Sequence, residues 1–290
     1  MANKRIGNRA EMKQNLIKCL VILILVPFIV LKYSSATHSN EYGSTCSIYD
    51  ELISSSVLAA TGEESTDNRE VIQTDVIETP NLSTPQGRAA ALGLPEPPDI
   101  DIDSWEFILA NGEHSIEKYE PSKTVSVEGQ IVDERIAEAL KAMAQDSRNQ
   151  GLQVYLSSGY RSYSEQAANF TRVCQNNGIT DGKNSKGFYI TMPAGCSEHQ
   201  TGLCCDITDV YYATKTSDVL EKTELYQYMS KHCQEFGFIV RFPDGDQQQI
   251  TGVMYEPWHY RYVGVEAATY IMDNALTLEE FIDLYIPGTI

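Results

Sequence analysis

The stretch CSEHQTGLCCDITD, Cys196–Asp209, places a histidine and an aspartate seven residues apart, on either side of a glycine. The run LCCDITDV predicts a short strand, and side chains on a strand alternate between its two faces. Asp206 therefore lies on the same face as Cys204. The adjacent Cys204 and Cys205 point to opposite faces and are poor disulfide partners for each other.

A second stretch, YEPWHYRYVG, places Glu256 three residues before His259. Its aromatic residues indicate another strand. On a straight strand, residues three apart face opposite sides. Glu256 and His259 can share one site only if the chain bends between them, and Pro257 permits such a bend.

The surrounding sequence mixes helices and strands without a βαβ rhythm, which predicts an α+β fold, a small antiparallel sheet flanked by helices. Ser162 with Glu165, and Thr277 with Glu280, form capping boxes at the start of two predicted helices. Helices are expected over 132–151, 162–178, 224–237 and 277–285, and strands over 152–158, 203–210, 238–242 and 254–264.

These residue types can form a catalytic zinc site, in which His and carboxylate ligands leave one position for water. Of the five histidines, only His199 and His259 have motif-like surroundings, and Asp206 is the natural third ligand. Glu256 could take a proton from a zinc-bound water. Composition alone fits both a zinc site and structural roles for these residues, and Cys196, Cys204 and Cys205 are alternative metal ligands. Arg161, just after a strand and turn, fits a site or a surface ion pair equally well.

The N-terminal and acidic segments suggest an exported protein. Residues 1–36 hold six basic side chains and the apolar run CLVILILVPFIVL, typical of a signal peptide or membrane anchor. Residues 37–104 are acidic and rich in Ser, Thr and Pro, which predicts a disordered tether before a folded domain at 105–290. The net charge of −18 argues against nucleic acid as a partner. A disulfide between Cys174 and Cys196 would close a loop of about twenty residues and add roughly 3 kcal/mol.

The segments SSGYRSYSEQ, SEHQTGLCCDI and EPWHYRYVG resemble the VanY-like D-alanyl-D-alanine carboxypeptidases, zinc metallopeptidases of the bacterial cell wall. The resemblance spans the predicted domain and implies a zinc-binding α+β fold related to hedgehog signalling domains. It implies that His199, Asp206 and His259 are the Zn²⁺ ligands and that Glu256 is the general base. It also implies that Arg161 binds the scissile carbonyl or a substrate carboxylate. Gln166 and Ser197 would bind the peptide terminus.

The implied substrate is the D-Ala-D-Ala end of peptidoglycan stem peptides, and a monomer outside the cytoplasm is expected. L,D-carboxypeptidase, D,D-dipeptidase and endopeptidase activities share these motifs, and a non-catalytic peptidoglycan-binding module is a further alternative. Two departures from the family pattern stand out. Cys204 and Cys205 replace small or aliphatic residues, and Phe242 stands where relatives often carry a tyrosine.

Overall fold

The computed structural model describes residues 79–212 and 217–290. All of them belong to the second of two contact units, Ser47–Ile290, and the first unit, Met1–Cys46, lies outside the described residues. The predicted signal or anchor, 1–36, and most of the predicted tether, 37–78, therefore lie outside them too. Within the described part of the chain, no helix is long and apolar enough to span a membrane.

A four-stranded antiparallel sheet forms the centre of the fold, in the order β3-β4-β6-β5. Its strands are β3 (Tyr155–Ser158), β4 (Cys204–Thr208), β5 (Phe238–Phe242) and β6 (Glu256–Tyr262). A separate hairpin, β1 (Thr124–Val127) with β2 (Gln130–Asp133), precedes it. The predicted α+β fold with a small antiparallel sheet is confirmed. The hairpin was not expected, and β2 includes the start of the predicted helix 132–151.

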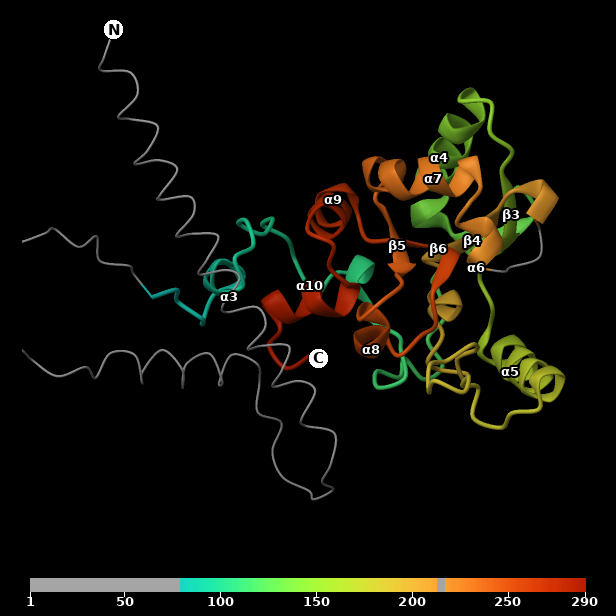
Figure 1. Ribbon diagram of the computed structural model, residues 1–290, viewed down its shortest axis with the longest axis horizontal. Coiled ribbons are helices and arrows are strands. Elements are labelled where there is room, and N and C mark those ends of the chain that lie inside the picture. Colours follow the sequence, from blue (N-terminus) through green and yellow to red (C-terminus); the bar gives the residue numbers. More distant parts are fainter. Residues whose placement is uncertain (1–78, 213–216) are drawn as a thin grey trace, which may run out of the picture. The chain divides into compact units, whose positions relative to one another are not determined.

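Helices surround this sheet, and Figure 1 shows α4 and α7 on one side of it and α5 on the other. Both predicted capping boxes are present, at the starts of α5 and α10. Gly178 ends α5 in the left-handed conformation that glycine favours. The helices are α3 (Pro85–Ala91), α4 (Ala137–Asn149), α5 (Tyr163–Asn177), α6 (Ser217–Leu220), α7 (Glu224–His232), α8 (Gln247–Thr251), α9 (Val265–Asp273) and α10 (Leu278–Tyr285).

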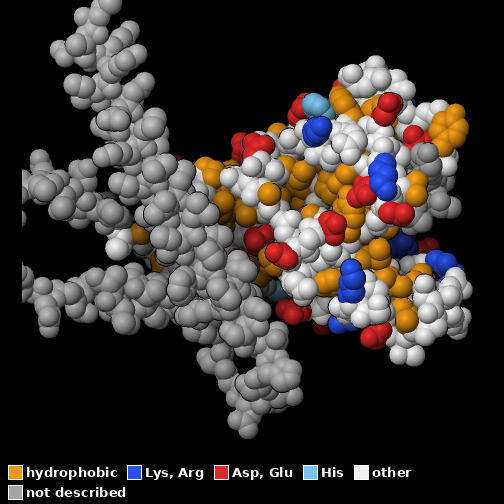
Figure 2. Space-filling model, in the orientation of Figure 1, with side chains coloured by type: hydrophobic (Ala, Val, Ile, Leu, Met, Phe, Trp, Pro, Cys, Tyr) orange, Lys and Arg blue, Asp and Glu red, His pale blue; other side chains and the backbone are white. Residues whose placement is uncertain are grey.

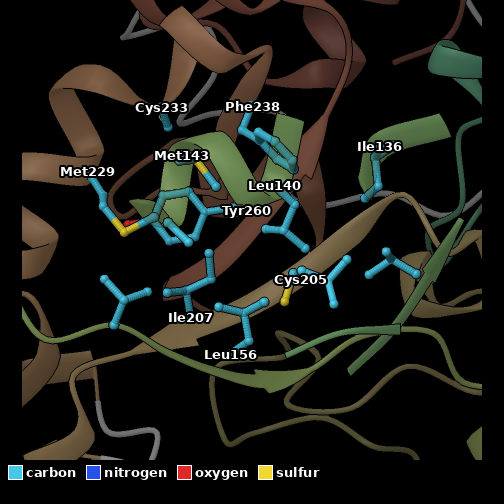
Figure 3. Packing of buried hydrophobic residues seen from close by; sticks show 14 of the residues in the cluster. Ile136, Leu140, Met143, Leu156, Cys205, Ile207, Met229, Cys233, Phe238 and Tyr260 are labelled. Atoms are coloured by element: carbon cyan, nitrogen blue, oxygen red, sulfur yellow. The ribbon is translucent and has the colours of Figure 1, made fainter. Parts of the chain in front are cut away.

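One face of the sheet is apolar and packs on α4 and α7. Cys205, Ile207 and Tyr260 belong to this core, together with Leu140 and Met143 of α4. Figure 3 shows these side chains gathered in one cluster. Because side chains alternate along a strand, the residues between them point to the opposite face, where the polar site lies.

Residues 79–104 are folded, which corrects the predicted extent of the tether. Arg88 of α3 donates from Nε to the Leu284 carbonyl at the end of α10, at 2.7 Å. The hydroxyls of Tyr270 and Tyr285 donate to the carbonyls of Pro95 and Pro98, at 2.7 and 2.6 Å. Composition alone did not predict this packing, because the few apolar residues of 79–104 are buried only when they pack with apolar residues of α9 and α10.

The predicted disulfide between Cys174 and Cys196 is wrong, since both residues are free thiols. Cys174 is buried in the last turns of α5. Cys196 packs instead on a small cluster of Met192, Phe242 and Val253 near the sheet. The two thiols therefore do not pair. On the face shown in Figure 2, acidic and basic side chains are interspersed over the described surface.

Candidate metal centre

The strand register brings the predicted ligands together on the polar face of the sheet. Asp206 of β4 pairs with His259 of β6 and with Ser158 of β3. Phe242 pairs with Glu256, whereas Val240 pairs with Tyr260, so β6 carries two more residues than β5 in this interval. This irregularity is the bend at Pro257 that Glu256 and His259 need in order to share one site. It places the Glu256 carboxylate 3.6 Å from Nδ1 of His259.

Two histidines and an aspartate converge in this bend. Nε2 of His199 lies 3.4 Å from one Asp206 oxygen, and Nδ1 of His259 lies 3.2 Å from the other. The two imidazole rings are 5.0 Å apart and nearly perpendicular. The three side chains are 3–6% exposed. His199 is held by a short 3-10 helix, Glu198–Thr201, which leads through Gly202 into β4.

In each imidazole, the nitrogen that points away from Asp206 contacts a second group. This contact orients the ring so that its other nitrogen faces Asp206. Nδ1 of His199 lies 2.7 Å from the Gly159 carbonyl, to which it can only donate. Nε2 of His259 lies 3.2 Å from a carboxylate oxygen of Glu198. Such outer partners orient histidine ligands in metal sites. Nε2 of His199 and Nδ1 of His259 are therefore the nitrogens left for a metal.

Glu198 belongs to a buried ionic network that sequence reasoning missed. It accepts hydrogen bonds from Arg241 and Arg261, at 2.7 and 2.8 Å, and Arg241 forms two more with Glu279. All four residues are at most 2% exposed. Burial raises the pKa of Glu198, but the two guanidiniums outweigh it and hold that pKa well below 4.5. The sequence contained one indication of this network, because Arg241 is a charged residue within the otherwise apolar strand sequence FIVRF.

Cys204 lies in the same cluster as the histidines. Its thiol and one nitrogen of each of His199 and His259 all lie within 4.8 Å of one another. Burial raises the pKa of the thiol, but the two histidines outweigh it and lower the pKa to about 6. Burial would lower the pKa of His259, yet Cys204, Asp206 and Glu198 hold it well above 6.5. The expectation that Cys204 shares the face of Asp206 is confirmed.

The cluster opens into a cavity of about 530 Å³. Arg161 and Ser197, two of the predicted substrate-binding residues, line it. The buried Nε of Arg161 has no hydrogen-bond partner among the described residues, so it can serve a ligand. Gln166 is not among the lining residues, because its amide is buried and donates to the Met192 carbonyl. Trp258, which no sequence argument singled out, also lines the cavity.

The donor set fits a zinc ion. Imidazole nitrogen, carboxylate oxygen and thiolate sulfur are the ligands that zinc takes in proteins. The buried atoms of His199, Asp206 and His259 face one another, while the Glu256 side chain, at 15% exposure, reaches the cavity. This arrangement suits a catalytic site, which keeps a position open toward its substrate.

Comparisons with known proteins agree with this geometry. The family model "VanY: D-alanyl-D-alanine carboxypeptidase" matches residues 129–265. The putative carboxypeptidase YodJ of Bacillus subtilis is 32% identical over 219 residues, 75% of this chain and 73% of that protein. A D-alanyl-D-alanine carboxypeptidase of Enterococcus faecalis is 34% identical over 197 residues, 63% of this chain and 68% of that protein.

Two solved structures are similar across their whole length. VanYB in complex with D-alanine-D-alanine is 32% identical with a TM-score of 0.52, over 62% of this chain and 98% of that one. A mutant of the D,D-pentapeptidase VanY from a VanB-type resistance cassette, in complex with Zn(II), is 31% identical with a TM-score of 0.52, over 62% and 99%. The chain therefore belongs to the VanY family of zinc D-alanyl-D-alanine carboxypeptidases.

Proposed function

We propose that this protein removes the C-terminal D-alanine from peptidoglycan stem peptides that end in D-Ala-D-Ala. The placement of Glu256 carries the proposal. Its carboxylate lies 3.6 Å from Nδ1 of His259 and reaches the cavity, whereas the side chains of His199, Asp206 and His259 are almost fully buried. An acid beside a metal site, but more open than its ligands, is suited to proton transfer.

The roles follow from the contacts. His199, Asp206 and His259 would hold the zinc, which would supply a Lewis acid able to activate water near neutral pH and to polarise a carbonyl. Glu256 accepts a proton from the attacking water and returns it to the departing amine of D-alanine. The free Nε of Arg161 stabilises the negative charge that develops on the scissile carbonyl oxygen.

Hydrogen bonds hold Arg161 close to the proposed metal ligand His199. The backbone N–H of Arg161 donates to the His199 carbonyl at 3.0 Å, and its Nη1 donates to the Ser158 hydroxyl at 3.2 Å. Arg161 is thus fixed relative to the metal ligand His199. Ser197, buried two residues before His199, lies at the cavity wall, where it can hold the end of the peptide.

We also propose a place of action outside the cytoplasm, from the sequence of the N-terminal segment. We expect residues 1–36 to export or anchor the chain and residues 37–78 to act as a tether that lets the domain reach cell-wall substrate some distance from the membrane. Support comes from the basic and apolar pattern of the first segment and the acidic composition of the second.

The test is incubation of the zinc-loaded protein with muropeptides ending in tri-, tetra- and pentapeptide stems, followed by mass spectrometry of the products. The proposal predicts loss of one alanine from the pentapeptide and no change in the tripeptide. Loss of alanine from the tetrapeptide alone would indicate L,D-carboxypeptidase activity. Release of a D-Ala-D-Ala dipeptide would indicate a D,D-dipeptidase, and either outcome would overturn the proposed specificity.

A further inference from the structure

Cys204 faces the proposed metal ligands because of its position in the sheet. It lies two residues before Asp206 on β4 and pairs with Arg261, as Asp206 pairs with His259. These four side chains therefore share the polar face. The Cys204 side chain is fully buried, and its sulfur lies within 4.8 Å of a nitrogen of each histidine.

Two other buried cysteines of the described chain, Cys205 and Cys233, have a different environment. Cys205 and Cys233 belong to the apolar core on the opposite face, where a thiol behaves as a small hydrophobic group. Burial raises the pKa of the Cys233 thiol to about 12. Cys204 is not part of that core, and its neighbours are the imidazoles of His199 and His259. Apolar packing therefore does not account for the position of its sulfur.

We propose that the Cys204 sulfur binds directly to the metal ion held by His199, Asp206 and His259. This inference rests on the proposed metal site and adds a donor to it. When the metal–sulfur bond forms, the thiol loses its proton to solvent and no electrons are transferred. The site then holds two nitrogen donors, one carboxylate and one sulfur.

A sulfur donor changes the coordination of the metal ion and the preference of the site among metal ions. Four protein ligands fill a tetrahedral zinc site, so a water molecule enters only as a fifth ligand or in place of the sulfur. Thiolate is also a soft ligand, which favours soft cations over hard ones. Cys204 therefore makes the site bind cadmium more tightly than a site with two histidines and a carboxylate alone.

The test uses the full-length protein loaded with one equivalent of cobalt(II) under a phosphine reductant. Direct sulfur coordination predicts a thiolate-to-cobalt charge-transfer band in the near ultraviolet, beside the visible bands of bound cobalt. Cys204→Ser and Cys204→Ala should keep the visible bands and lose the ultraviolet band. Cys196→Ser is the matched control, since Cys196 also lines the cavity, and it should keep both.

Visible bands without the ultraviolet band in the unmutated protein would overturn the role of Cys204 and leave the proposed metal site intact. An ultraviolet band that persists in Cys204→Ala would also overturn it. Failure to bind cobalt, or binding unaffected by His259→Ala, would instead remove the ligand set itself. Cadmium NMR of the unmutated protein gives a second readout that needs no variant, because a sulfur ligand moves the resonance strongly downfield. A cadmium shift typical of nitrogen and oxygen donors alone would contradict the inference.

Discussion

Replacing Glu198 with glutamine tests the buried network that holds His259. The network contains two guanidiniums, of Arg241 and Arg261, and two carboxylates, of Glu198 and Glu279, so its formal charge is balanced. Glu198→Gln keeps the size of the side chain and removes one negative charge. A net positive charge is then left where both guanidiniums are fully buried.

The structure sets the size of the expected effect. Arg241 keeps both hydrogen bonds to Glu279, at 2.9 and 2.7 Å. Arg261 keeps three carbonyl partners, at 2.7, 2.8 and 3.0 Å, but loses its only carboxylate among the described residues. Breaking a buried ion pair typically costs 3–5 kcal/mol. Because a glutamine oxygen still accepts a hydrogen bond, we expect a loss near the lower end, about 3 kcal/mol, in the free energy of unfolding.

Metal binding should weaken as well, because Nε2 of His259 loses its charged partner. Loss of such an outer partner typically lowers metal affinity about 10–100-fold. Denaturant unfolding of the metal-free protein measures the first effect, and zinc competition with a chelator measures the second. Glu266→Gln, at an exposed position of α9, is the control and should change stability by less than about 0.5 kcal/mol. Wild-type stability and zinc affinity in Glu198→Gln would refute the role given to this network.

Three further expectations follow from the site and the fold. Removal of zinc by a chelator should abolish alanine release, and added zinc should restore it; release that persists in the metal-free protein would contradict a metal mechanism. Arg161→Lys keeps the charge but loses the planar guanidinium, so turnover should fall while zinc content stays near one per chain; equal loss of both would indicate a structural role. Limited proteolysis should cut within 37–78 before it cuts within 79–104, because the latter packs on α10; early cleavage between 85 and 104 would contradict that packing.

The sequence predicted the parts of the site that depend on local order. The sequence shows how far His199 lies from Asp206, and how far Glu256 lies from His259. These spacings determine which side chains can lie close together once β4 and β6 pair. The capping boxes at Ser162 and Thr277 were readable for the same reason, since each depends on residues three apart. Here local patterns were sufficient.

The parts that were missed depend on contacts between distant segments. Glu198 lies next to a predicted ligand, but its partners Arg241 and Arg261 are more than forty residues away in the sequence. Residues 79–104 look like a tether until α9 and α10 are present to cover them. The Cys174–Cys196 pair satisfied loop-length reasoning, yet both thiols are free, and Cys196 packs on Met192, Phe242 and Val253 instead.

The most direct test of the central claim compares zinc content and catalysis in one variant, Glu256→Gln. If His199, Asp206 and His259 hold the metal and Glu256 only moves the proton, the variant keeps about one zinc per chain, as measured by elemental analysis. Its rate of D-alanine release from a D-Ala-D-Ala pentapeptide falls by about 10²–10⁴, the range typical of general acid–base catalysis. His259→Ala, in contrast, loses the zinc. Near-normal hydrolysis by Glu256→Gln, or loss of its zinc, would contradict the account.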